Sequence, residues 1–440
     1  MTSSGFNHII SDNYQYYLTY LKDLIAIRSV FTDRPGIKRA IRYCKDALER
    51  NLPGWHVYFD PKHNLIARPD AVDTEKAIVY LSAHIDTVDA NAAEWAGSSS
   101  PFEAFEDERE IRGRGASDCK AGVAYELFLA LLHARHYLVL DNIIFTVTFN
   151  EEGSGDKTAT EIGSNLGVSL PVSESGTYLI VLENNVRALM PPVLSVYARE
   201  RGNYVIKTRG TLEHLQTWMK KHTGWNPVCI YPDADVDAQA CKIMQQESRH
   251  VCSVPRQDNL LLKLILDASP DSVLKAGQER NFAVLPASVA ISKVPSAVEH
   301  TVILSNRSFD SLEQVQTQLH GLSYQQMKSL SLSQGLDVRD KLSKSPLADI
   351  LEDCRSKELD IELTDNIGCS DASIVYNTID PAVRKNLLLV VMGPGTRSQP
   401  HAHPRRFTHG RNETFDKESG KKAMIYITNV LFRLRAISIP

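Results

Sequence analysis

Imidazole and carboxylate side chains recur at the edges of the strands and loops expected for this chain, in SAHIDTV, GRGASDCKAG, FNEEGSG, VLENN and THGRNE. Both side-chain types bind divalent ions such as zinc, and a carboxylate has two oxygens with which it can bridge two ions. The sequence therefore predicts a carboxylate-rich site for two metal ions. The residues that could build it are His84, Asp86, Asp118, Glu151, Glu152, Glu183 and His409.

The first of these motifs follows AIVYLSA, an apolar run that is typical of a buried strand. Side chains alternate along a strand, so His84 and Asp86 share a face. The Asp86 carboxylate can then take the imidazole proton that metal binding does not need. A purely structural pair is the alternative, and the other candidate ligands favour the metal site.

Asp118 ends a glycine-rich turn that precedes AGVAYELFLALLHARH, an apolar segment with the length of a helix. Glycine lets the backbone of such a turn approach an ion closely, and Asp118 could then bridge two ions. The next residue is Cys119, for which we expect packing rather than ligation.

Two further apolar runs also end in carboxylates: NIIFTVTF leads to Glu151 and Glu152, and TYLIVL leads to Glu183. Adjacent side chains cannot point the same way, so one glutamate of the pair can bind metal while its neighbour faces the substrate as a base. A solvated loop pair is the alternative reading. Strands that end in ligands at one edge of a sheet are typical of sites in open α/β folds.

The ordered set of motifs resembles the dinuclear-zinc aminoacylase and carboxypeptidase family, the M20 metallopeptidases. This family includes succinyl-diaminopimelate desuccinylase, acetylornithine deacetylase and glutamate carboxypeptidase. The resemblance extends over most of the chain. Besides the ligand motifs it includes Trp95, Pro101-Phe102, Gly368-Cys369-Ser370-Asp371-Ala372, Gly393-Pro394-Gly395 and Asn412-Glu413.

The resemblance implies a ligand set. One ion would take His84, Asp118 and Glu183, and the other would take Asp118, Glu152 and His409. Glu151 would be the general base, and Asp86 would orient the histidine ligand. This set of carboxylates and imidazoles suits zinc, with cobalt and manganese as alternatives.

Three histidines compete for the last ligand position, because His401, His403 and His409 lie close together. Only His409 fits the family pattern His-x-x-Asn-Glu, which ends here at Glu413. We therefore assign His409, and the other two would line the entrance or lie in a loop.

A further catalytic histidine is expected in the lid domain, where this chain departs from the family pattern. His250 is followed by Pro255 and Asn259, as the pattern requires, but an apparent insertion at 211–248 separates it from the strand that ends at Gly210. His214 fits the spacing but lacks the following Pro and Asn, and neither histidine is the third possibility. The favoured residue, His250, would donate a hydrogen bond to the tetrahedral oxyanion, across a dimer interface.

Arg307 matches an arginine that the family carries at the end of a lid strand. Its guanidinium would suit a substrate carboxylate, and a surface arginine is the alternative. Ser373 replaces a frequent arginine of the family, and Ala283-Val284-Leu285-Pro286 replaces its Asn-Val-Ile-Pro turn. Both changes predict an altered substrate pocket.

Alternating apolar strands and amphipathic helices predict an α/β fold. We expect a zinc-peptidase-like α/β catalytic domain, residues 1–195 and 327–440, with an inserted α+β lid of βαββαβ type at 196–326. The resemblance implies that the lid carries the interface of a homodimer. Aromatic and proline residues in the 211–248 insertion favour a packed cap over a flexible linker, with a peripheral ornament as the alternative.

Composition agrees with a soluble enzyme: 440 residues, 43% hydrophobic and 23% charged. The formal net charge of -4 leaves no basic footprint for nucleic acid. No signal peptide or membrane span is apparent, so we expect a cytoplasmic protein. Its 7 scattered cysteines suggest reduced thiols.

We therefore expect a hydrolase that cleaves an amide bond of an N-acyl amino acid or a small peptide by a two-metal-activated water. One rival is the same chemistry on an unusual, specialised amide. The other is a catalytically silent binding homologue, whose mark would be loss of a ligand or of the base. The sequence shows neither loss.

Overall fold

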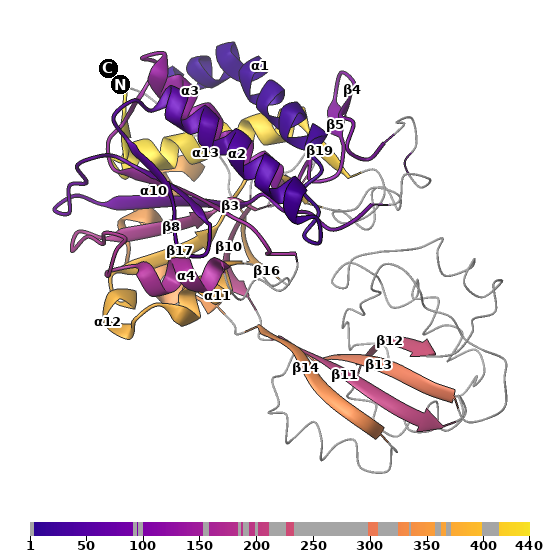
Figure 1. The fold of residues 1–440 in the computed structure, drawn as a ribbon. Helices are drawn as coiled ribbons and strands as arrows, with labels where there is room; N and C mark the ends of the chain where they lie inside the picture. Colours follow the sequence, from indigo (N-terminus) through magenta and orange to yellow (C-terminus); the bar gives the residue numbers. More distant parts are fainter. Residues whose placement is uncertain are drawn as a thin grey trace. The chain divides into compact units, whose positions relative to one another are not determined.

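The structure, a computed structural model, describes a series of segments that form two compact units, one comprising Met1–Ala198, Leu336–Gln399 and Arg405–Pro440 and the other Arg199–Gly335 and Pro400–Pro404 (Figure 1). The described residues are 4–90, 95, 100–152, 158–183, 186–187, 193–198, 201–210, 226–232, 298–306, 324–333, 336–356, 362–366, 371–397 and 413–440.

A nine-stranded mixed sheet forms the centre of the first unit, in the order β1-β2-β7-β3-β8-β17-β10-β15, with β16 paired to β10. Within it β7, β3, β8 and β17 run parallel to one another. Antiparallel pairs flank this group, β1–β2 and β2–β7 on one side and β17–β10 and β10–β15 on the other, whereas β16 pairs parallel with β10. The strands are β1 (His56–Phe59), β2 (Leu65–Arg68), β3 (Ile78–His84), β7 (Ile143–Thr148), β8 (Thr177–Val181), β10 (Val193–Ala198), β15 (Leu336–Asp337), β16 (Glu362–Asn366) and β17 (Leu387–Val391).

The four central parallel strands are buried along their whole length. Parallel strands covered by helices on both faces are continuously apolar rather than alternating, which explains runs such as IVYLSA and LLLVV. The strands that the sequence predicted before His84, Glu151 and Glu183 are therefore present.

Helices cover both faces of this sheet. Figure 1 shows α1, α2, α3 and α13 on one face and α4, α11 and α12 on the other. Asp33 begins α2 by accepting a hydrogen bond from the Gly36 N–H, and Asp416 begins α13 in the same way through Ser419. The helices of this unit are α1 (Ser4–Ala26), α2 (Arg34–Asn51), α3 (Lys120–Ala134), α4 (Thr158–Asn165), α9 (Arg339–Ser343), α10 (Pro346–Ser356), α11 (Asp371–Thr378), α12 (Pro381–Arg384) and α13 (Lys417–Arg433).

Small sheets tie distant parts of the first unit together. The most important one has the order β19-β5-β4 and pairs residues 414–416 with residues 110–112, just before the turn that holds Asp118. The small strands are β4 (Phe105–Glu106), β5 (Glu110–Arg112), β6 (Val139–Leu140), β9 (Val186–Arg187), β18 (Thr396–Arg397), β19 (Thr414–Asp416) and β20 (Ile437–Ser438).

The second unit contains a four-stranded antiparallel sheet in the order β12-β13-β11-β14. Its strands are β11 (Arg201–Gly210), β12 (Asn226–Pro232), β13 (Val298–Asn306) and β14 (Tyr324–Ser333). The segment predicted as an insertion thus contributes an edge strand, β12. The remaining elements of the expected βαββαβ unit, helices at 258–269 and 310–322 and a strand at 281–294, lie outside the described residues.

The predicted α/β class is confirmed by this architecture. Within the described segments, no helix combines the length and the apolar character that crossing a membrane requires.

Candidate metal centre

The candidate ligands of the first unit lie where its parallel strands end. His84 is the last residue of β3, Glu151 and Glu152 follow β7 within four residues of Thr148, and Glu183 follows Val181 of β8. Because β7, β3 and β8 are parallel neighbours in register, these ends meet at one edge of the sheet. That edge is where ligands bind in open α/β folds.

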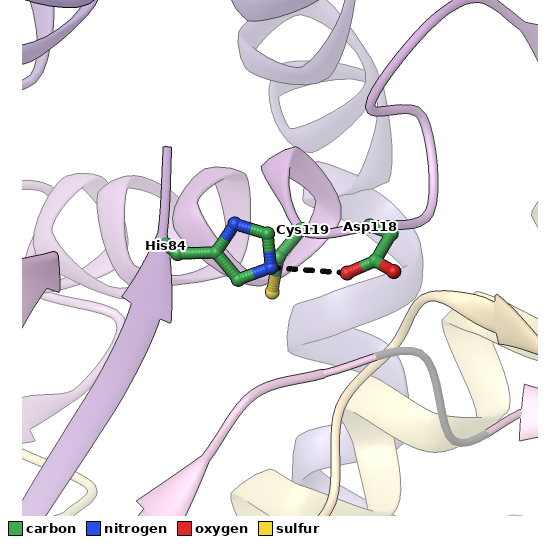
Figure 2. A group of neighbouring side chains, drawn as sticks. All are labelled: His84, Asp118 and Cys119. Atoms are coloured by element: carbon green, nitrogen blue, oxygen red, sulfur yellow. Dashed lines mark hydrogen bonds and ion pairs between the residues drawn. The ribbon is translucent and has the colours of Figure 1, made fainter. Parts of the chain in front are cut away.

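His84 and Asp118 are in direct contact: the Nε2 atom of His84 lies 3.0 Å from Oδ1 of Asp118 (Figure 2). The other ring nitrogen, Nδ1, lies 3.0 Å from the main-chain oxygen of Asp86 and 3.5 Å from its Oδ1. Asp86 therefore fixes the orientation of the His84 imidazole, so that Nε2 faces the carboxylate of Asp118. This is the arrangement of a metal-binding histidine supported from behind.

Asp86 also holds the two glutamates. Its carboxylate is fully buried, and it accepts hydrogen bonds from the Glu151 N–H at 3.2 Å and the Glu152 N–H at 3.1 Å. One carboxylate thus joins the end of β3 to the turn after β7. The expected role of Asp86 toward His84 did not include this second contact.

Two glycines let neighbouring elements approach the main chain at Glu183. A Cβ on Gly393, just after β17, would lie 2.1 Å from the carbonyl oxygen of Glu183. A Cβ on Gly122, in α3, would lie 2.3 Å from the carbonyl oxygen of Leu182. Any side chain at either position would displace the segment that carries this ligand.

Asp371 is a buried acid to which the sequence assigned no individual role, although its motif was part of the family resemblance. It begins α11 and is 2% exposed, and its Oδ2 accepts a hydrogen bond of 2.8 Å from Thr148 Oγ1. Thr148 pairs with His84 across β7 and β3, so Asp371 belongs to the same cluster. The contact joins residues 223 positions apart, which local patterns cannot reveal.

The electrostatics of the cluster favour added positive charge. Burial raises the pKa of Glu151 and Glu183 well above that of an ordinary glutamate, and neighbouring carboxylates raise it further. Burial also raises the pKa of Asp371 to about 6. For His84, burial favours the neutral ring, but the acidic groups around it outweigh burial and raise its pKa.

The donor set fits divalent metal ions. Besides the His84–Asp118 contact, Oε1 of Glu183 is buried and has no hydrogen-bond partner within the described part of the chain. Such an atom is costly unless a ligand satisfies it. The donors are carboxylate oxygens and an imidazole nitrogen, and a bound cation would stabilise the buried carboxylates. This donor set matches zinc, cobalt or manganese.

Cys119 lies close enough to be considered as a ligand, since one donor atom from each of His84, Asp118 and Cys119 falls within 4.8 Å of the others (Figure 2). Its thiol, however, donates a hydrogen bond to the Leu182 carbonyl at 2.8 Å. Burial raises the pKa of this thiol well above its usual value, whereas a metal ligand must be a thiolate. The geometry favours a packed thiol.

Several expected site residues lie outside the described residues: His409 and its neighbours His401 and His403, the lid histidines His250 and His214, and Arg307. Their assignments stay predictions.

The fold and the cluster define a doubly wound α/β protein with a histidine–carboxylate site at the carboxyl edge of its parallel strands. The profile of peptidase family M20/M25/M40 matches residues 80–432, and the chain belongs to this family. The resemblance inferred from the motifs is thereby confirmed.

Individual relatives fit this family. The chain is 32% identical over 150 residues to succinyl-diaminopimelate desuccinylase of Rickettsia canadensis (strain McKiel). The matched stretch covers 33% of this chain and spans only 38% of that relative.

Among solved structures, human carnosine dipeptidase 1 is similar with a TM-score of 0.64 and 12% identity, over 98% of this chain and 99% of that chain. A dinuclear metal binding peptidase of the M20 family from Bacillus subtilis is similar with a TM-score of 0.51 and 13% identity, over 97% of this chain and 99% of that chain. Identities this low support the fold alone.

Proposed function

We propose that this protein is a metal-dependent hydrolase that cleaves the amide bond of an N-acyl amino acid or a small peptide. The observation that carries the proposal is the contact of 3.0 Å between buried His84 and partly buried Asp118, surrounded by Glu151, Glu183 and Asp371. Membership of the M20 family supports it. So do the names of similar proteins, one a desuccinylase and one a dipeptidase.

Two ions would be held as the family resemblance implies, with Asp118 as the shared ligand. His84 and Glu183 would complete one position, and Glu152 with His409 would complete the other. We favour zinc, with cobalt and manganese as alternatives. Bound divalent ions supply a Lewis acid and lower the pKa of a coordinated water.

Glu151 is the proposed general base. Its main chain is fixed by the bond from its N–H to Asp86, and the N–H of the adjacent Glu152 is held by the same carboxylate. The Glu151 carboxylate would accept a proton from the attacking water and return it to the departing amine. Asp86 would act by holding both His84 and this turn.

The second unit is proposed to act as a lid and to form a homodimer, as the resemblance implies. His250 would stabilise the oxyanion, with His214 as the alternative, and Arg307 would bind a substrate carboxylate. Replacing each with alanine distinguishes the roles, because loss of an oxyanion donor lowers kcat whereas loss of a carboxylate anchor raises KM. Light scattering on the purified chain tests the dimer, and the cytoplasmic location stays a prediction.

An unusual specialised amide remains the alternative substrate class, since Ser373 replaces a frequent arginine of the family. A silent binding homologue is the other alternative. The sequence retains the proposed base Glu151 and the proposed ligands His84, Asp118 and Glu183, which disfavours this alternative.

A substrate screen tests the proposal. Protein shown by metal analysis to be loaded is incubated with N-acetyl amino acids, N-succinyl amino acids and dipeptides, and amine release is measured. We expect release from one class, abolished by a chelator and by Glu151→Gln. No release from any class by the loaded protein would favour the binding homologue.

A further inference from the structure

Glu413 is a buried carboxylate for which neither the ligand set nor the proposed mechanism has a use. It is 1% exposed and immediately precedes β19. Its carboxylate faces the glycine-rich turn that ends at Asp118, although almost 300 residues separate the two in sequence.

Four donors of that turn converge on the Glu413 carboxylate. Its Oε1 accepts the main-chain N–H groups of Ser117 and Asp118, each at 2.9 Å. Its Oε2 accepts the N–H of Gly115 at 3.1 Å and the Nη1 of Arg114 at 2.8 Å. Each carboxylate oxygen therefore binds two donors, and one of them is the N–H of Asp118 itself.

Neighbouring contacts extend this attachment. The Gly113 N–H donates to the main-chain oxygen of Glu413 at 3.1 Å, and Ser117 Oγ donates to the Thr414 carbonyl at 2.6 Å. The turn is thus fixed at its start, through its middle and at its end. Gly115 has a φ of +83°, which a residue other than glycine adopts only with strain.

A simple stabilising ion pair between Arg114 and Glu413 is the competing interpretation. It accounts for one of the four contacts. The remaining three go to backbone N–H groups of the turn, which an arginine partner alone would not require. Charge-assisted bonds to backbone N–H groups are also the stronger type and define the local backbone conformation.

We propose that Glu413 is a positioning residue for metal binding: it holds the main chain of the 115–118 turn so that the Asp118 carboxylate meets His84 and the ions. The inference rests on the proposed function, in which Asp118 is the shared ligand. Residues that support a ligand from behind typically change metal affinity about 10- to 100-fold when altered.

Glu413→Gln is the sharpest change, because it keeps the shape of the side chain. The glutamine has one oxygen where the glutamate has two, so its amide group must face one of the two donor pairs. The N–H groups of the glutamine amide would then face N–H groups of the turn with no acceptor between them, and the turn would have to shift. Asp118 would lose its position although its own side chain is unchanged.

Asp416 provides a matched control. It is a buried acid at the end of β19, the short strand that follows Glu413, and it accepts bonds from the Ser419 N–H at 2.8 Å and from Arg109 Nε at 3.3 Å. Asp416→Ala removes the cap of α13 and should lower the melting temperature. These bonds attach its carboxylate to the start of α13 and to Arg109, so we expect metal affinity to be unchanged.

Zinc titration of the full chain by calorimetry, with circular dichroism and melting curves alongside, tests the inference. We expect Glu413→Gln to weaken zinc binding about 10- to 100-fold, and Asp416→Ala to bind as the wild type does. If Glu413→Gln does not fold, Glu413→Asp keeps the charge opposite Arg114 but withdraws the carboxylate from the turn, and it should weaken binding in the same direction.

The outcomes separate the two proposals. Wild-type affinity in folded Glu413→Gln or Glu413→Asp would overturn the role of Glu413 and leave the proposed function standing. Equal weakening by Asp416→Ala would reduce the effect to general stability and would also overturn it. A wild-type chain that binds none of zinc, cobalt and manganese would overturn the proposed function itself.

Discussion

Two regions of the first unit bury acidic side chains, and they differ in what surrounds them. At the edge of the sheet, acids from several strand ends converge, and Asp86 and Asp371 accept hydrogen bonds there. Inside the helical layer, Glu126 of α3 is 0% exposed, and neither of its carboxylate oxygens has a hydrogen-bond partner within the described part of the chain.

Burial alone raises the pKa of Glu126, whereas at the sheet edge the acids also raise each other's pKa. A buried acid is therefore not by itself evidence of a binding site. Convergence of several acids and a histidine on one point makes a cation site, and an isolated buried acid makes a protonated carboxylic acid.

The largest effect should come from the proposed base. Glu151→Gln should lower kcat about 100-fold or more while the metal remains bound, since general acid–base groups contribute about 10²- to 10⁴-fold. Its neighbour gives the matched control, because Glu152→Gln should weaken metal binding instead. Near-normal turnover of Glu151→Gln on a confirmed substrate would remove it from the role.

A smaller loss is expected for Asp86→Asn, which disturbs both His84 and the Glu151–Glu152 turn. We expect kcat/KM to fall about 10- to 100-fold, the range for residues that orient metal ligands. Asp89→Asn is the control, since this carboxylate is 65% exposed and its contacts are with Arg28 and the adjacent Ala90 N–H rather than with His84 or the Glu151–Glu152 turn. Equal losses in both variants would contradict the assigned role of Asp86.

In the helical layer, replacing the buried acid Glu126 should increase the stability of the protein, whereas replacing acids at the sheet edge should lower its activity. A raised pKa means that the folded protein prefers protonated Glu126, so this group's contribution to stability is complete below its ordinary pKa of 4.5 and is lost as pH rises toward the folded pKa. Glu126→Gln removes that loss. The free energy of unfolding of this variant should therefore exceed that of the wild type by an amount that grows with pH, by at most about 1.4 kcal/mol per pH unit.

Denaturant unfolding of Glu126→Gln at several pH values measures this trend. Glu418→Gln is the control, because Glu418 is exposed, and hydrogen bonding to Lys422 lowers its pKa. That variant should show no gain that grows with pH. A Glu126→Gln gain that is independent of pH would mean that the carboxylate is ionised in the folded protein.

The smallest effect is expected for Cys119→Ser, although Cys119 is the residue next to Asp118. The hydroxyl can still donate to the Leu182 carbonyl, as the thiol does at 2.8 Å. Metal content and turnover should be unchanged. Loss of an ion in this variant would make Cys119 a ligand.

Local patterns in the sequence were sufficient for the parallel strands and for the residues at their ends. β3, β7 and β8 are buried apolar runs. Such runs can be recognised in the sequence without knowing which strands lie beside them. The family follows from the order of the motifs, and the profile match confirms it.

Long-range contacts could not be predicted in this way. The bonds of Asp86 to the Glu151–Glu152 turn, of Thr148 to Asp371 and of Asp118 to Glu413 join segments 65, 223 and 295 residues apart. Hydrophobic periodicity shows which face of a helix or strand is apolar, but it does not show which other segment of the chain packs against that face.

Strand β12 was missed for a different reason. Its sequence, NPVCIYP, contains two prolines, which argue against a central strand. At the edge of a sheet, proline is tolerated because its missing N–H is not needed by a second neighbour. Whether a segment with prolines can form a strand therefore depends on the position of that strand in the sheet. The local sequence does not give this position.

The central claim is that Asp118 joins two metal ions at the sheet edge. Metal analysis of the chain under saturating zinc tests it most directly, with Asp118→Asn compared with the wild type. We expect two ions per wild-type chain and a loss at both positions in the variant, because a shared ligand serves both ions. No more than one tightly bound ion in the wild type, or two ions retained by Asp118→Asn, would contradict it.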